Sequence, residues 1–306
     1  MRKSVLCLLL SFAAGCVQER VDLMHVSKIE TRTRGIGFAD DGKAADAGMA
    51  GNTCRFDIKS GYITLDSDLA QGEDDTVTDA WNGNTVISSH SGGFIMSDGY
   101  MTSNPIHVFP GRNVTDARLT EDSVTVLINE NNDCQIGRHT ASTEVTAQID
   151  GECPTDVNQF DVNRETGTAY FTSPDGVMTY GPLGFDYFVP RADKIEWDEV
   201  TQTLYTATSG NDVTSYDING DVRWSASLNG RVVSFDDMGT AEAMIAMVEL
   251  PDGSGELVIL DAQTGQVRKS FPTPTAANHI IVSRDGGTLA VVLDNETHFF
   301  TINTTN

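Results

Sequence analysis

The cysteines of this chain are the residues whose chemistry depends most on their positions. Cys54, Cys134 and Cys153 lie beyond the first 16 residues, and no two of them stand two to four residues apart, so a zinc site is not expected. In an oxidising compartment, Cys134 and Cys153 are the predicted disulfide, since one lies on a strand-like segment and the other just past the next. A disulfide that closes a loop of 18 intervening residues stabilises a fold by about 3 kcal/mol. Cys54 is then expected to be unpaired or buried.

Acidic residues recur near the ends of strand-like segments, and carboxylate oxygens are ligands for hard metal ions. They are Asp79, Asp116, Asp161 and Glu196. If these side chains point together into a channel, they form a candidate metal site; if they face solvent, they do not. A second acidic run, residues 66–68 with 73–75, lacks the spacing of an EF-hand loop and is expected to be a solvated linker. No catalytic residue is assigned, because the six histidines are scattered and no nucleophile or phosphate-loop motif is present.

Composition limits the class of protein. The chain has 306 residues and a formal net charge of -24, from 20 Lys and Arg against 44 Asp and Glu. Nucleic-acid binding needs a positive surface, so a nucleic-acid partner is not expected. The length suits one all-β domain of about 250 residues plus an N-terminal segment.

The N-terminus has the layout of an export signal. Two basic residues precede the apolar run 5–10, and the small residues 13–15 precede Cys16. The apolar run is too short to cross a bilayer permanently. Residues 13–16, Ala-Ala-Gly-Cys, resemble the bacterial lipobox, which implies cleavage before Cys16 and lipidation of that cysteine. An ordinary cleaved signal peptide is the alternative.

This resemblance implies a protein anchored to the bacterial cell envelope through the lipid on Cys16. Val17 stands where aspartate retains such proteins in the inner membrane, so the outer membrane is favoured. The predicted divisions are a signal peptide at 1–15, a lipidated cysteine with a flexible tether at 16–53, and a folded domain at 54–306. The tether is predicted because much of this segment is rich in small residues and has no hydrophobic period.

A strand-like run followed by a polar turn recurs from residue 76 onward. The ends of these runs are Trp81, Leu119, Val162, Trp197, Phe235 and Ser283. Their intervals are 38, 43, 35, 38 and 48 residues, and about 40 to 50 residues is the length of a four-stranded propeller blade. The sequence therefore predicts an all-β protein, a β-propeller of six four-stranded blades. A two-sheet sandwich is the alternative fold.

Closure of the ring needs a strand from elsewhere, because the last unit stops after its third strand. Residues 55–58 or 62–65 are expected to supply it. If both runs belong to a further blade, the propeller has seven blades.

Two segments resemble the blade ends of PQQ-like propeller repeats: 260–268, Leu-Asp-Ala-Gln-Thr-Gly-Gln-Val-Arg, and 216–224, Tyr-Asp-Ile-Asn-Gly-Asp-Val-Arg-Trp. Residues 283–292 are similar to the strand pair of YVTN and WD40-like repeats. These resemblances imply a propeller and leave its activity open. Quinone-dependent enzymes of the PQQ class typically have eight blades, a Ca²⁺ site and adjacent cysteines, and this chain has no adjacent cysteines, so no cofactor is expected.

Two functions follow from these patterns. The first is an envelope lipoprotein whose propeller is a non-enzymatic binding or scaffold platform for a protein or glycan partner. Propeller-shaped lipoproteins that act as scaffolds in outer-membrane assembly are similar in layout. The second is a metal-dependent hydrolase or lyase, similar to propeller lactonases, with its site in the axial channel. The sequence does not decide whether that channel binds a metal.

Overall fold

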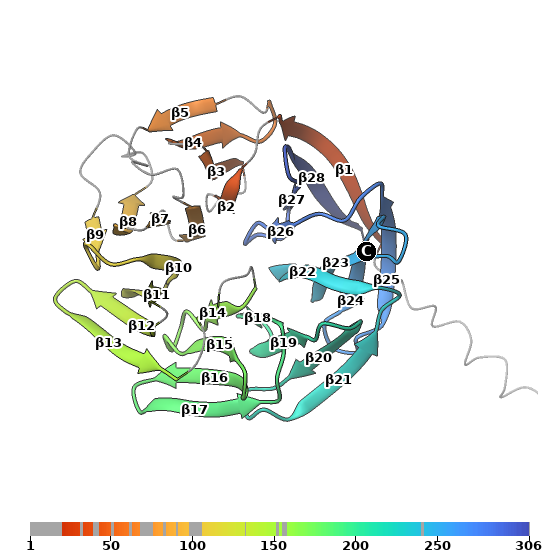
Figure 1. Cartoon of the computed structure of the whole chain (residues 1–306). Helices are drawn as coiled ribbons and strands as arrows, with labels where there is room; N and C mark the ends of the chain where they lie inside the picture. The colour runs from red at the N-terminus through yellow and green to blue at the C-terminus, as the bar shows by residue number, and fades with distance from the viewer. Residues whose placement is uncertain are drawn as a thin grey trace, which may run out of the picture.

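The computed structural model of the chain is a ring of β-sheets around a central axis (Figure 1). It describes residues 20–30, 33–38, 43–49, 52–60, 63–67, 76–81, 84–89, 91–97, 106–131, 133–150, 153–154, 158–239 and 242–305. Seven sheets of four antiparallel strands stand side by side around the axis. The protein is a seven-bladed β-propeller.

Blades 1 to 6 follow one another along the chain, each starting at the axis and ending at the rim, whereas blade 7 takes its rim strand from the N-terminal part of the chain. Blades 1 to 3 are β2 (Arg34–Phe38), β3 (Ala44–Met49), β4 (Asn52–Asp57), β5 (Ile63–Ser67); β6 (Thr76–Trp81), β7 (Asn84–Ser89), β8 (Gly92–Ser97), β9 (Ile106–Val108); and β10 (Val114–Leu119), β11 (Ser123–Glu130), β12 (Asp133–Thr140), β13 (Glu144–Ile149). Blades 4 and 5 are β14 (Phe160–Val162), β15 (Ala169–Ser173), β16 (Gly176–Gly181), β17 (Gly184–Val189); and β18 (Lys194–Asp198), β19 (Thr203–Ala207), β20 (Asp212–Tyr216), β21 (Val222–Ser227). Blade 6 is β22 (Arg231–Asp237), β23 (Ala243–Glu249), β24 (Gly255–Asp261), β25 (Val267–Thr273), and blade 7 is β26 (His279–Val282), β27 (Thr288–Val292), β28 (Thr297–Thr305) and β1 (Arg20–Ile29).

The predicted propeller is confirmed, and seven blades rather than six form the ring. Both runs proposed for closure belong to blade 1, as β4 and β5. An N-terminal strand does close the ring, but it is β1, which pairs with β28 from Arg20 opposite Thr305 to Ile29 opposite Thr297. The prediction of a flexible tether over 16–53 is therefore wrong where the structure describes this segment, because β1, β2, β3 and the first residues of β4 lie there.

The second strand of each blade explains the continuous hydrophobic runs of the sequence. In β23, Ala243, Ile245 and Met247 pack into a cluster shared with blade 7. The alternate residues of β23 pack into a different cluster, shared with blade 5; they are Met244, Ala246 and Val248. A strand covered by a neighbouring blade on each face has no solvent-facing side, so its residues are apolar throughout.

The Asp-x-x-x-Gly turn of blade 6 shows how one blade fits the next. Gly265 has φ +69°, a left-handed conformation that glycine adopts without strain. A Cβ atom at Gly265 would lie 2.4 Å from the ring of Trp224 in blade 5. The Trp224 indole N–H donates to the Ala262 carbonyl in the same turn at 2.8 Å. The turn needs glycine because a tryptophan of the neighbouring blade packs against it.

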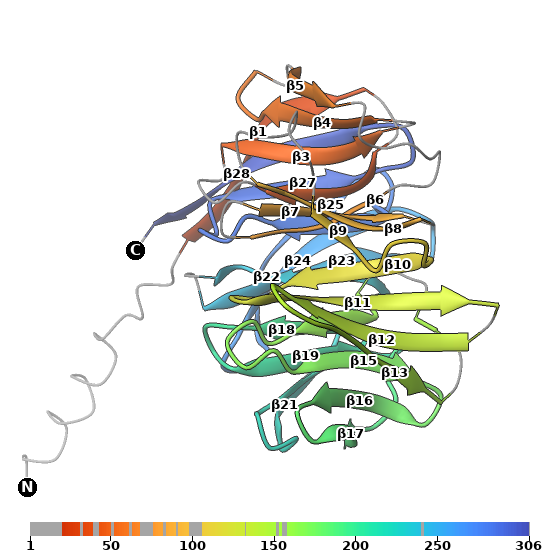
Figure 2. The same cartoon turned by 90° about the vertical axis from the view of Figure 1, so that its left-hand side faces the viewer.

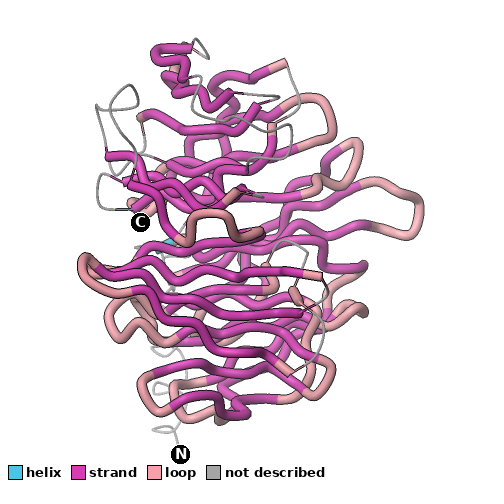
Figure 3. Tube along the Cα trace, turned by 60° about the vertical axis from the view of Figure 1, so that its left-hand side comes forward, coloured by secondary structure: helices cyan, strands magenta, loops and turns pink. Residues whose placement is uncertain are grey.

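The direction of the strands places both described chain ends at one end of the ring. β1 is antiparallel to β28, β28 to β27, and β27 to β26, so β1 runs opposite to the innermost strand β26. β1 thus begins, and β28 finishes, at the end of the ring where the innermost strands finish, which we call the carboxyl end of the channel (Figure 2). Strands and connecting loops make up nearly the whole described chain (Figure 3). No helix among the described residues is long and apolar enough to cross a membrane.

Candidate functional site in the axial channel

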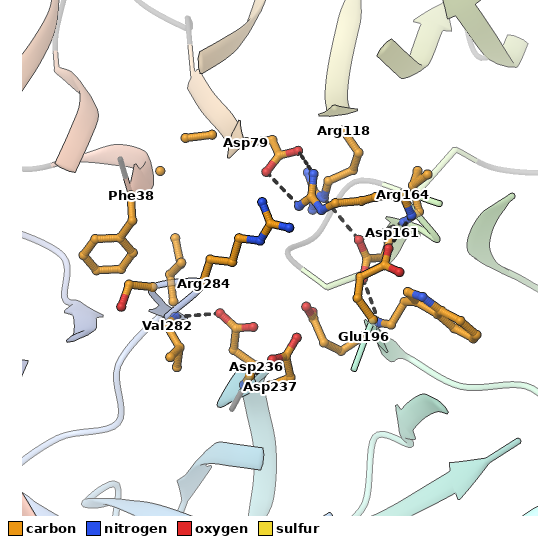
Figure 4. Close-up of a pocket in the computed structure, with 18 of the residues that line it drawn as sticks. Phe38, Asp79, Arg118, Asp161, Arg164, Glu196, Asp236, Asp237, Val282 and Arg284 are labelled. Carbon is orange, nitrogen blue, oxygen red and sulfur yellow. Dashed lines mark hydrogen bonds and ion pairs between the residues drawn. The ribbon is translucent and has the colours of Figure 1, made fainter. Parts of the chain in front are cut away.

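The channel holds a cavity of about 790 Å³ at its carboxyl end. Most of its wall is made by the last residues of the innermost strands and by the loops that follow them, and every blade contributes. Acidic side chains predominate in this wall: Asp79, Glu121, Asp161, Glu165, Glu196, Glu199, Asp236 and Asp237, against Arg118, Arg164 and Arg284. Figure 4 shows the labelled charged side chains pointing toward one another across the cavity.

The four carboxylates whose orientation the sequence leaves open, toward the channel or toward solvent, lie in the channel. Asp79, Asp161 and Glu196 line the large cavity. Asp116 lines a smaller cavity of about 380 Å³, which shares part of its wall with the large one. The alternative expectation, that these side chains face solvent between blades, is not observed.

Three axial aspartates are hydrogen-bonded to the next blade. Oδ2 of Asp79 in β6 accepts from the Leu119 N–H of β10 at 2.7 Å. The other two bonds repeat this geometry at 2.7 Å each: Asp161 accepts from Trp197, and Asp236 from Val282. Each aspartate thus joins one innermost strand to the following one, as Figure 4 shows for Asp236 and Val282. This structural role satisfies a backbone donor at the blade interface.

Two arginines neutralise part of the acidic wall. Arg164 donates to the Asp79 carboxylate at 2.6 and 3.0 Å and to the Leu119 carbonyl at 2.7 Å. Burial alone would raise the pKa of Asp79, but the Arg164 charge and its hydrogen bonds hold it below the ordinary value. Arg118 forms an ion pair with Asp116 and donates to the carbonyls of Thr78 and Phe160, in the two flanking blades, at 2.9 and 3.2 Å. These arginines are therefore part of the blade-to-blade bonding.

Opposite the arginines lies a cluster of three carboxylates, Glu196, Asp236 and Asp237. One oxygen of each lies within 4.8 Å of the others, close enough to hold a metal ion. Burial, with the negative charge of the neighbouring carboxylates, raises the pKa values of Glu196 and Asp236 well above the ordinary range. The pKa of Asp237 rises to about 7, through burial and then through the charge of Asp198. The cluster thus retains protons at a pH where exposed carboxyl groups have lost theirs.

A histidine also faces this channel. The imidazole of His279 is hydrogen-bonded to the Ser234 hydroxyl at 2.9 Å. Burial, and then the charges of Arg118 and Lys194, lower its pKa to about 3, so the ring is neutral at ordinary pH. Ser234 in turn donates to the Asn158 side-chain oxygen at 2.8 Å, and Asn158 donates to Glu196 at 2.9 Å. This chain of polar groups fixes one wall of the cavity.

Sequence reasoning missed Asp236, Asp237 and the loop arginines Arg164 and Arg284. The run Phe235-Asp-Asp was interpreted as the end of a strand and a turn, although both aspartates belong to β22. The available signal was positional, because Asp236 follows a buried aromatic as Asp161 follows Phe160. The arginines lie in loops whose sequence gives no indication that they enter the channel.

The cysteines have the arrangement that the sequence predicts where the structure describes them. Cys134 and Cys153 form a disulfide with an S–S distance of 2.08 Å and a Cα–Cα distance of 4.9 Å. Cys54 is buried, 2% exposed, in the hydrophobic cluster that joins blades 7 and 1. The signal peptide and Cys16 lie outside the described residues, so their assignment stays a prediction.

The fold defines a seven-bladed β-propeller. One similar solved structure is a chain in a crystal structure of the mitotic checkpoint complex, with a TM-score of 0.72 and 11% sequence identity, over 93% of this chain and 94% of that one. At this identity the likeness shows the fold alone. No protein-family model matches the chain. The search of curated proteins also gave no match.

Proposed function

We propose that this chain is a lipoprotein of the bacterial cell envelope, anchored in the outer membrane, whose propeller binds a protein or glycan partner without catalysing a reaction. The observation that carries the proposal is the hydrogen bonding of Asp79, Asp161 and Asp236, each of which accepts a backbone N–H of the next blade. Two of the residues that the sequence suggested as metal ligands, Asp79 and Asp161, thus bond one blade to the next. These bonds make the ring rigid, and a rigid propeller suits the binding of a protein partner.

The predicted lipid on Cys16 supports the envelope location. Only four residue steps separate Cys16 from Arg20, the first residue of β1. An extended chain covers at most about 3.6 Å per residue, so the anchor would lie within about 14 Å of the ring. Because Arg20 lies at the carboxyl end of the channel, that end, with the large cavity, would be held near the lipid surface.

The anchor is tested by metabolic labelling with a palmitate analogue in a bacterial host. Cys16→Ser should abolish labelling and release the protein from the membrane fraction, because lipidation needs the thiol. Cys7→Ser in the predicted signal peptide is the matched control and should leave labelling unchanged. Equal labelling of the wild type and Cys16→Ser would contradict the anchor.

The second candidate function is a metal-dependent hydrolase or lyase with its site in the channel. The observation that favours it is the Glu196, Asp236 and Asp237 cluster, which offers three oxygen ligands in a cavity of about 790 Å³. Such an enzyme would use the ion to polarise a carbonyl or to activate water. Titration with divalent ions separates this candidate from the binding platform.

A further inference from the structure

The outermost strand of blade 4 exposes more large apolar surface than the other outer strands whose side chains are described. β17 ends its sheet at the rim of the ring (Figure 1). Phe185 and Tyr187 on this strand are 38% and 53% exposed, and Leu183 in the preceding turn is fully exposed. Each of the other described outer strands exposes one large apolar side chain: Met24, Ile106, Val145, Val222 and Val267.

β17 lacks the basic and proline residues that protect many sheet edges from pairing. Edge strands are commonly blunted by lysine, arginine or proline. β21 carries Arg223, and β25 carries both basic residues and Pro272. β17, Gly-Phe-Asp-Tyr-Phe-Val, has none of these, and its one charged residue is Asp186. This edge is therefore suited to an additional strand.

The exposed rings of β17 are held in place by packing on one side. Phe185 contacts the rings of Tyr180 and Phe171, with centroids 4.9 and 6.0 Å away. Tyr187 lies over Gly176, where a Cβ atom would be 2.5 Å from ring atom Cε2. Aromatic rings that are rigid before binding lose little entropy in a complex, and they commonly dominate binding energy.

The charge on this strand selects the partner. Side chains alternate between the faces of a strand, so Phe185 and Tyr187 share one face and Asp186 lies on the other. Asp186 is exposed and accepts the Tyr187 N–H at 2.9 Å. A second copy of this chain would bring a like charge against Asp186 and would add a second net charge of -24.

We propose that β17 is a docking edge for an extended segment of a partner protein, with apolar residues alternating with lysine or arginine. The apolar residues pack on Phe185 and Tyr187, the basic ones lie on the face of Asp186, and the segment adds a strand to blade 4. This inference rests on the proposed function, of which it specifies the protein partner and the surface.

The test uses a fluorescent synthetic peptide of alternating valine and lysine, about eight residues long to span the strand. Fluorescence anisotropy measures its affinity for the whole mature protein and for Tyr187→Lys. The substitution should weaken binding at least about tenfold, because it removes a ring anchor and repels the peptide. Val222→Lys is the matched control, since it adds the same charge at an exposed position of another outer strand, and it should change the affinity less than about twofold. Thermal melting checks that both variants remain folded.

Three results would overturn the proposal. Equal weakening by Tyr187→Lys and Val222→Lys would mean that the peptide is attracted by net charge alone. Equal binding of a valine and glutamate peptide would remove the role of Asp186. A wild-type dimer that Tyr187→Lys dissociates would identify a second copy as the occupant. Failure here leaves the envelope anchor standing, because labelling of Cys16 tests that separately.

Discussion

Asp79 combines two roles at the axis, because its carboxylate binds the Leu119 N–H of the next blade and the Arg164 guanidinium. Leu119 is buried, and the side chains of Arg164 and Asp79 are 22% and 9% exposed. In such a setting the net gain from the carboxylate's own bonds is small, but its removal would leave the Leu119 N–H and the Arg164 guanidinium without an acceptor, which is costly. The axial aspartates are therefore expected to govern stability.

Asp79→Ala should lower the free energy of unfolding by about 3 kcal/mol, since it removes the acceptor of a buried N–H and the charge opposite Arg164. Asp79→Asn keeps an oxygen for Leu119 and should cost less. Urea unfolding measures both, with Asp175→Ala in an exposed turn as the control. A loss below about 0.5 kcal/mol in Asp79→Ala would contradict the structural role.

The raised pKa of Asp237 gives stability a defined pH dependence. Its value of about 7 in the folded protein exceeds the ordinary 3.8, so the folded state holds a proton that the unfolded state has released. Stability from this group is full below about pH 4 and declines as the pH rises toward and through about 7.

Asp237→Asn mimics the protonated form and keeps an oxygen acceptor for the Gly239 N–H, a bond of 2.6 Å in the native protein. The variant should be more stable than wild type by about 1 to 3 kcal/mol at about pH 8, and nearly equal to it at about pH 4. Thermal unfolding across this range, with Asp175→Asn as the control, checks the sign. A wild type that gains stability relative to Asp237→Asn as the pH rises would show that the sign is wrong.

At the residue scale, the sequence places Asp79, Asp161 and Glu196 near the ends of first strands, but it leaves open whether they face the channel or solvent. It does not predict what they bind. The N–H that meets Asp161 belongs to Trp197, in the next blade, and its position depends on how two blades pack. Such contacts between units have no local sequence signal.

At the scale of elements, β1 closes the ring. It has polar residues among its apolar ones, as an outer strand does, and its stability comes from pairing with β28. Such a segment has no clear hydrophobic period, so its sequence alone indicates a linker. The strand with which it pairs lies at the opposite end of the chain. The second strands of the blades, covered on both faces, are recognisable from their continuous apolar runs.

Ile29 and Met24 on β1 offer a matched test of closure. Ile29 is 5% exposed and packs in the cluster that joins blades 7 and 1, whereas Met24 is 57% exposed. Ile29→Ala should lower the free energy of unfolding by about 2 to 4 kcal/mol, and Met24→Ala by less than about 0.5 kcal/mol. Equal effects in chemical denaturation would mean that β1 is not integral to the ring.

At the scale of the whole molecule, the acidic cavity and the proposed docking edge lie on different surfaces of the ring. The large acidic cavity opens at the carboxyl end, near Arg20 and the proposed lipid anchor, whereas β17 lies at the rim. The repeat of about 40 residues predicts this architecture, but the number of blades depended on residues 20–67, where the spacing signal is weak. A fragment that begins at residue 52 would lack β1, β2 and β3, so the mature chain is the form to study.

The central claim is that the axial carboxylates hold the blades together and that the propeller is a binding platform. Calorimetric titration of the mature protein with Ca²⁺ and then Zn²⁺ at about pH 8, above the pKa of Asp237, tests it most directly. The account predicts no saturable binding that Glu196→Gln removes. One ion bound per chain in the wild type, and lost in Glu196→Gln, would contradict it and favour the metal-dependent hydrolase or lyase.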